Sequence, residues 1–117
     1  MTTEEIFTKL AEHMLEGMKI HCDFAQVYDF LGLYGFSKCH EYHYLAETKG
    51  FEGLLHYYSC RYHKLLKLDA ISNSNIIPEN WYKYTTMAID TGTIRNAIKT
   101  LMEKWVQWEK DTKTFYS

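Results

Sequence analysis

The chain has 117 residues, a formal net charge of −2, 46% hydrophobic residues and 24% charged residues. A chain of this size normally folds as one domain, and this composition is typical of globular rather than disordered proteins. The slightly negative charge argues against nucleic acid as the main ligand, because binding to phosphates needs a concentrated basic surface. We expect a single domain over residues 1–117.

The sequence contains no run of about 18 apolar residues, so we expect no membrane span. The first five residues lack the basic and apolar regions of a secretory signal peptide. The three cysteines, Cys22, Cys39 and Cys60, do not have the spacing of a metal motif. We interpret them as reduced, half-buried thiols, which predicts a cytoplasmic protein.

The first predicted helix covers residues 3–31. Apolar residues recur from Phe7 to Leu31 at alternating steps of three and four, which is typical of one face of a helix. Thr2 and Glu5 have the spacing of a capping box at its start.

The second predicted helix covers residues 37–68. Gly32 and Gly35 bracket the break before it, and Ser37 is the expected N-cap. Gly50 and Gly53 lie inside this helix and weaken it by about 1 kcal/mol each relative to alanine. A kink or break at these glycines is therefore the alternative.

The third predicted helix covers residues 78–112, after a loop at 69–77. Pro78 suits the first turn of a helix, where its missing N–H is harmless. The apolar stripe from Tyr84 to Trp108 keeps its phase through Gly92, which favours one helix over two. The predicted fold is all-α, an antiparallel bundle of three long helices, or four if the last one breaks near Gly92.

All six histidines lie in the first 63 residues. If the first two helices form a hairpin centred near residue 34, His21 lies beside Glu47, and Asp29 lies level with His40. Such pairs can be buried polar contacts that fix the register of two helices. This interpretation is the main alternative to a chemical site.

A metal site is the chemical interpretation of the same residues. His40, His43 and Glu47 are spaced i, i+3, i+7 and therefore share one face of a helix. Together with His21 they are the candidate metal ligands, and imidazole and carboxylate donors suit Zn, Fe or Mn.

The segment from Cys39 to Glu47, which follows a long amphipathic helix, resembles ferritin-like helical bundles. It is also similar to small helical accessory proteins of bacterial phages and mobile elements. The resemblance implies a bundle fold. Ferritin-like di-iron sites use Glu-x-x-His motifs, whereas Tyr44 stands where the motif beginning at Glu41 requires histidine.

Aromatic residues make up 16% of the chain, more than the core of a thin bundle can hold. Tyr42 and Tyr57 fall off the apolar stripe of the second helix, and Tyr82 falls beside that of the third. We predict that Tyr42, Tyr57, Tyr82 and Trp108 contact a partner, because Tyr and Trp are favoured anchors of interfaces. Packing at the edge of the core is the alternative.

These features predict a non-enzymatic protein that binds another protein, associates with itself as a homodimer and needs no cofactor. The resemblance implies an accessory or inhibitory role in a phage or mobile element. The first alternative is a metal-binding, ferritin-like bundle with its site between the first two helices. A small-ligand binder with an aromatic pocket is the second.

Overall fold

The structure is a computed structural model that describes residues 1–68, 76–83 and 91–117. Helix α1 runs over Thr3–Phe30, α2 over Tyr34–Tyr62 and α3 over Thr91–Tyr116, and a short 3₁₀ helix, η1, covers Glu79–Lys83. The described residues contain no strand, and the predicted all-α fold with three long helices is confirmed. In the same part of the chain, no helix is both long and apolar enough to cross a membrane.

Helix α1 begins and ends close to the predicted positions. The Thr2 hydroxyl accepts a hydrogen bond from the Glu5 backbone N–H at 3.1 Å, and the Glu5 carboxylate accepts one from the Thr2 N–H at 3.3 Å. This confirms the capping box. At the other end, Gly32 has a φ of 75° and the Leu33 N–H donates to the Tyr28 carbonyl at 2.8 Å. This pattern is a Schellman motif, whose left-handed position favours glycine.

Helix α2 begins three residues earlier than predicted, at Tyr34. The Schellman motif completes the turn by Leu33, so little further loop is needed. Ser37 is therefore not the N-cap. It is buried in the first turns of α2, where its N–H donates to the Leu33 carbonyl at 3.1 Å.

Helix α2 also ends earlier than predicted, at Tyr62 rather than near residue 68. His63 closes it in the left-handed conformation with a φ of 54°, and its N–H donates to the Ser59 carbonyl. The helix continues through Gly50 and Gly53, which confirms the prediction of one helix across both glycines.

The predicted single helix over residues 78–112 is wrong at its start. Residues 79–83 form η1, and α3 begins at Thr91, so Gly92 lies in its first turn and does not break it. The intervening residues 84–90 of that prediction lie outside the described residues. In the predicted loop, Ile76 and Ile77 are buried in the core, and the rest of it, 69–75, is not described.

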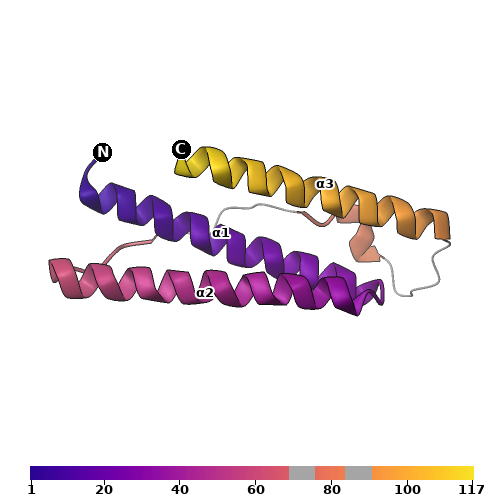
Figure 1. The fold of residues 1–117 in the computed structure, drawn as a ribbon, viewed down its shortest axis with the longest axis horizontal. Coiled ribbons are helices and arrows are strands. Elements are labelled where there is room, and N and C mark those ends of the chain that lie inside the picture. The colour runs from indigo at the N-terminus through magenta and orange to yellow at the C-terminus, as the bar shows by residue number, and fades with distance from the viewer. Residues whose placement is uncertain (69–75, 84–90) are drawn as a thin grey trace.

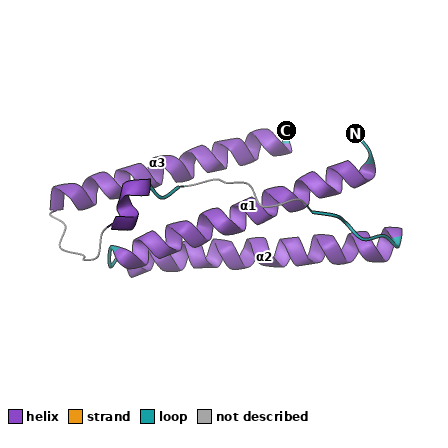
Figure 2. Cartoon of the chain, turned by 180° about the vertical axis from the view of Figure 1, so that it is seen from behind, coloured by secondary structure: helices purple, strands orange, loops and turns teal. Residues whose placement is uncertain are grey.

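Helix α1 is antiparallel to both other helices, and α3 runs in the same direction as α2 (Figures 1 and 2). Helix α3 begins at the end of the molecule opposite to the end of α2, so it is not the directly joined, antiparallel neighbour of α2 that the prediction assumed (Figure 1). The molecule is elongated, with extents of 55 × 22 × 22 Å.

The core joins α1, α3 and the segment before η1. Its buried cluster comprises Ile20, Phe24, Val27, Tyr28, Leu31, Ile76, Ile77, Ala97, Leu101 and Trp108. Helix α2 contributes only three buried residues, Ser37, His40 and Tyr58. It packs along α1 on one side, and no other described helix lies on the side that faces away from α1 (Figure 1).

Candidate functional site

The predicted histidine cluster exists, but in a different register from the predicted one. His21 of α1 lies against His40 of α2, with 3.0 Å between their Nδ1 atoms, and its ring stacks on that of His43 at a centroid distance of 5.0 Å. The early start of α2 shifts the pairing of the two helices. As a result Asp29 is exposed and is not the buried partner of His40.

The cluster is closed to solvent. His21 is 2% exposed and His40 is 1% exposed. The His40 ring stacks on Phe24 at 4.5 Å and meets the Trp105 ring edge-on at 4.5 Å. Its Nε2 atom is buried without a hydrogen-bond partner.

Burial sets the charge of these two rings. Desolvation lowers the pKa of His21 to about 4, and repulsion from His40 and His43 lowers it further. Desolvation, followed by repulsion from His43, also lowers the pKa of His40 to about 4. Both rings are therefore neutral at pH 7, and one Nδ1–H donates to the other ring's Nδ1.

Glu47, the fourth predicted ligand, lies against another part of α1. A Cβ built on Gly17 would come within 3.2 Å of the Glu47 Cδ and 3.3 Å of the Trp108 ring. Burial and then repulsion from Glu109 raise the pKa of the Glu47 carboxyl. Within the described ranges, no group of three or more His, Cys, Asp or Glu residues is arranged to hold a metal ion.

The metal site therefore stays a prediction without a matching arrangement of ligands. The Nδ1 atoms of His21 and His40 are directed at each other, which favours the alternative of a polar contact between α1 and α2. This contact fixes the register of the two helices, since moving either ring would leave the other buried without a partner.

His13 joins α1 to α3 instead of α2. Its ring stacks on Trp108 at a centroid distance of 4.7 Å and on Phe115 at 4.2 Å. Its Nε2 atom lies 3.1 Å from the Thr112 hydroxyl. Trp108, one of the predicted partner contacts, is only 8% exposed and belongs to the core.

The other three predicted contact residues are exposed. Tyr42 is 71%, Tyr57 52% and Tyr82 58% exposed. Tyr42 and Tyr57 lie on α2, where the Tyr57 ring also stacks on Phe7 of α1 at a centroid distance of 6.0 Å, whereas Tyr82 belongs to η1. The two α2 tyrosines thus share one exposed surface of α2, and Tyr57 lies at its edge, beside α1.

This surface, which we call the outer face of α2, is larger than the sequence analysis indicated. Its residues, all exposed, are Cys39, Tyr42, Leu45, Ala46, Lys49, Gly53, His56, Tyr57 and Cys60. The prediction of half-buried thiols is wrong, because all three cysteines are exposed and unpaired. In the sequence, the residues of this outer face recur at spacings of three and four, on a different side of the helix from the inner apolar stripe.

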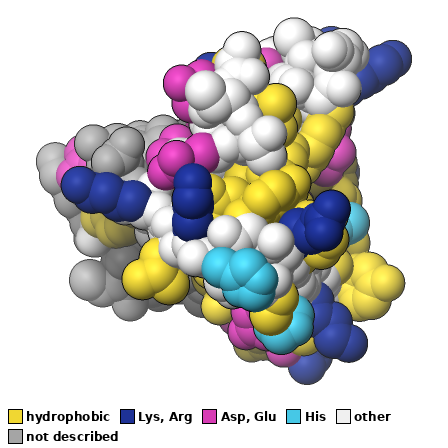
Figure 3. Space-filling view, turned by 90° about the vertical axis from the view of Figure 1, so that its left-hand side faces the viewer, with side chains coloured by type: hydrophobic (Ala, Val, Ile, Leu, Met, Phe, Trp, Pro, Cys, Tyr) yellow, Lys and Arg dark blue, Asp and Glu magenta, His cyan; other side chains and the backbone are white. Residues whose placement is uncertain are grey.

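Exposed side chains of several kinds meet at the end of the molecule where α2 finishes. Histidine, basic and hydrophobic side chains share this end surface (Figure 3). They include His56, Arg61, Tyr62, His63 and Leu65, all exposed.

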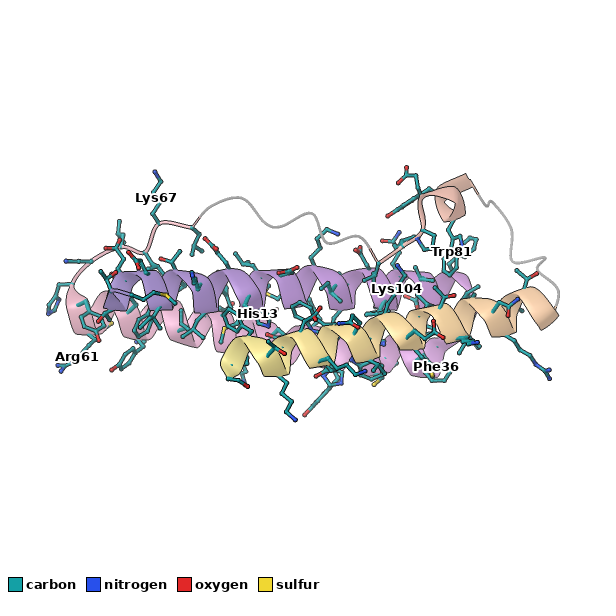
Figure 4. The ribbon with its side chains drawn as sticks, turned by 90° about the horizontal axis from the view of Figure 1, so that it is seen from above. His13, Phe36, Arg61, Lys67, Trp81 and Lys104 are labelled. Carbon is teal, nitrogen blue, oxygen red and sulfur yellow. The ribbon has the colours of Figure 1, made fainter. Side chains whose placement is uncertain are left out.

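Phe36 lies near the opposite end of α2 from Arg61 (Figure 4).

One thiol and one imidazole lie close together on α2, with the Cys60 Sγ 3.8 Å from the His56 Nε2. Nucleophilic catalysis also needs donors that stabilise the developing oxyanion. Both residues lie within α2, where the backbone N–H groups are already used in helical hydrogen bonds. The pair therefore lacks the donors of an acyl-transfer site.

An apolar hollow lies beside Trp81, between the end of α1 and the start of α3. It has a volume of about 220 Å³ and is lined by Phe30, Leu31, Trp81, Thr93, Asn96, Ala97 and Thr100. Ligand pockets usually measure about 300–1,000 Å³. The hollow is thus small for the aromatic ligand pocket considered as an alternative.

No protein family, curated protein or solved structure matches the chain. The resemblance to ferritin-like bundles and to phage accessory proteins therefore stays a prediction.

Proposed function

We propose that this chain is a non-enzymatic helical protein that acts through protein–protein contacts and associates with itself through the outer face of α2. One observation carries the proposal: Tyr42 and Tyr57 are each more than half exposed on a helix that packs along α1.

The energetics favour a contact at this face. A tyrosine carries a large apolar ring with few rotatable bonds, so burying it in an interface costs little conformational entropy. Leu45 adds an exposed aliphatic side chain between the two rings along the helix. Contiguous exposed apolar surface of this kind is typical of protein contacts.

The interior supports a role without catalysis. His21 and His40, the residues with the most strongly shifted pKa values, are closed to solvent, so a substrate cannot reach them. The unpaired, exposed thiols of Cys22, Cys39 and Cys60 suit a reducing compartment, and we propose the cytoplasm. An accessory or inhibitory role in a phage or mobile element is the context that the resemblance implies.

Sedimentation velocity over a range of concentrations tests self-association. We expect the wild-type chain to sediment as a dimer at high concentration. Replacing both Tyr42 and Tyr57 by alanine should weaken the dimer by roughly a hundredfold, since truncating each anchor in an interface costs over 1 kcal/mol.

Tyr82→Ala is the matched control. It removes an equally exposed tyrosine from η1, away from the outer face of α2, and should leave the dimer intact. A wild-type chain that stays monomeric at every concentration contradicts self-association. A dimer that survives the double replacement but not Tyr82→Ala places the contact elsewhere.

A further inference from the structure

The sequence of α2 has nearly the same residue types when followed in either direction from its centre. The centre lies between Lys49 and Gly50. Residues at equal distances on its two sides match in type: Cys39 with Cys60, Tyr42 with Tyr57, His43 with His56, Leu45 with Leu54, Ala46 with Gly53, and Glu47 with Glu52. A direct repeat would keep the order of these residues, whereas here the order is reversed.

The matching residues also share one line on the helix surface. At about 100° per residue, Cys39, Tyr42, Ala46, Gly53, Tyr57 and Cys60 all lie within about 30° of a line along α2, over a length of about 32 Å. Each of the six is exposed. A Cβ built on Gly53 would meet no atom within 4 Å, so this line is open at its middle.

An inverted order of residues allows a helix to pair with a second copy of itself about a two-fold axis perpendicular to the helix. Such an axis places two copies of the helix antiparallel, so that each residue faces the one at the same distance on the other side of the centre. For α2 the axis would pass between Lys49 and Gly50. Within the line, each cysteine would then face a cysteine, each tyrosine a tyrosine, and Ala46 would face Gly53 of the second copy.

We propose that the outer face of α2 binds the same face of a second copy of this chain, with the two α2 helices antiparallel and centred between Lys49 and Gly50. The proposal rests on the proposed function and specifies the partner and its register. Ala46 faces the second copy's Gly53 near the axis, where small residues let two helices approach closely. Tyr42 packs beside the second copy's Tyr57.

The charges next to the axis agree with this register. Lys49 and Glu52 are both exposed and lie on the same side of the line. Rotation about the two-fold axis places this side of both copies on the same side of the dimer. Each Lys49 therefore lies close to the second copy's Glu52, which gives two opposite-charge pairs and balances the two lysines that flank the axis.

The cysteines at the ends of the line report the register directly. In the antiparallel pair, Cys39 lies opposite the second copy's Cys60, and the reverse contact is equivalent. A disulfide requires Cα atoms about 4.4–6.8 Å apart, which facing positions of two closely packed helices satisfy. In a parallel pair, each cysteine would instead meet the same cysteine of the second copy.

Oxidation of single-cysteine chains tests the register. In a Cys22→Ser background, one variant carries Cys39→Ser and the other Cys60→Ser, and all three positions are exposed, so the fold should persist. Diamide is the oxidant: two thiols give up two electrons and two protons as the S–S bond forms, and diamide is reduced to the hydrazine. Each variant alone should stay uncrosslinked, and an equimolar mixture should give a dimer with one chain of each kind.

Three other outcomes overturn the register, and sedimentation of the same samples separates them from failure of the proposed function. Crosslinks within each single variant indicate a parallel pair. A sedimenting dimer without crosslinks, alone or mixed, indicates another contact surface and leaves self-association standing. Chains that sediment as monomers and do not crosslink overturn both proposals.

Discussion

Helices α1 and α2 have almost the same length, 28 and 29 residues, but they bury very different numbers of side chains. Seven residues of α1 are buried, against three of α2. Helix α1 lies between two neighbours, whereas α2 is covered on one side only (Figure 1). The residues of α1 therefore determine most of the fold, whereas the uncovered half of α2 is available for a partner.

The largest effect that we expect is a loss of folding stability at low pH, which arises at the contact between α1 and α2. The pKa values of His21 and His40 are near 4 in the folded chain and near 6.5 in the unfolded chain. As the pH falls from 6.5 to 4, the unfolded state binds protons that the folded state does not. Stability is therefore lost across this window, by up to about 3 kcal/mol per histidine.

Urea titrations between pH 7 and pH 4 measure this loss. Glu47 acts in the opposite sense, because its raised pKa favours the folded state on protonation, and it offsets part of the effect. His40→Phe removes one of the two buried rings and should reduce the acid-induced loss by about half. An unchanged loss in this variant would mean that other groups cause it.

The next prediction compares the loss of stability on truncating a buried aromatic ring with that on truncating an exposed one. Phe24 is fully buried in α1 and stacks on His40, so Phe24→Ala should destabilise the fold by about 3–5 kcal/mol. Tyr42→Ala on the outer face, where Tyr42 is 71% exposed, should change the stability of the monomer by about 0.5 kcal/mol or less. Urea unfolding at low protein concentration compares them, and similar losses would contradict the assignment of the two faces.

Two glycines give a smaller contrast within the α1–α2 contact. At Gly50 an added Cβ would meet only Met14, at 3.9 Å, so Gly50→Ala should stabilise α2 by about 0.5–1 kcal/mol. At Gly17 the carboxyl of Glu47 and the ring of Trp108 crowd the same position. Gly17→Ala should therefore not show this stabilisation. A melting temperature that is higher for Gly17→Ala than for Gly50→Ala would contradict the packing described.

No effect at all is expected from removing metal. Protein purified without a histidine tag should contain less than about 0.1 equivalent of Zn, Fe or Mn, and chelation should leave its melting temperature unchanged, because a bound metal would stabilise the native state. Elemental analysis with one equivalent of metal would restore His21, His40, His43 and Glu47 as candidate ligands.

Much of the fold was predictable from the sequence because it depends on local signals. The capping box at Thr2 and the glycine at the end of α1 mark that helix, and steps of three and four mark the faces of α1 and α2. The ends of α2 were harder to predict. A Schellman motif at Gly32 and a left-handed histidine at His63 set them, and neither conformation follows from hydrophobic periodicity.

The candidate site was predictable only in part. A hairpin register depends on the length of its turn, and a change of a few residues replaced the predicted contact of His21 with Glu47 by its contact with His40. The exposure of Tyr42 and Tyr57 was predicted correctly from their phase. The burial of Trp108 was not, because it depends on His13 of a distant helix.

The most direct test of the central claim is one substitution at the middle of the outer face. Gly53→Gln places a long side chain where the two α2 helices should approach closely, at a position that is open in the single chain. It should raise the melting temperature of the monomer, since glutamine is the better helix former, and abolish the dimer in sedimentation. A Gly53→Gln chain that still forms the wild-type dimer would contradict association through this face.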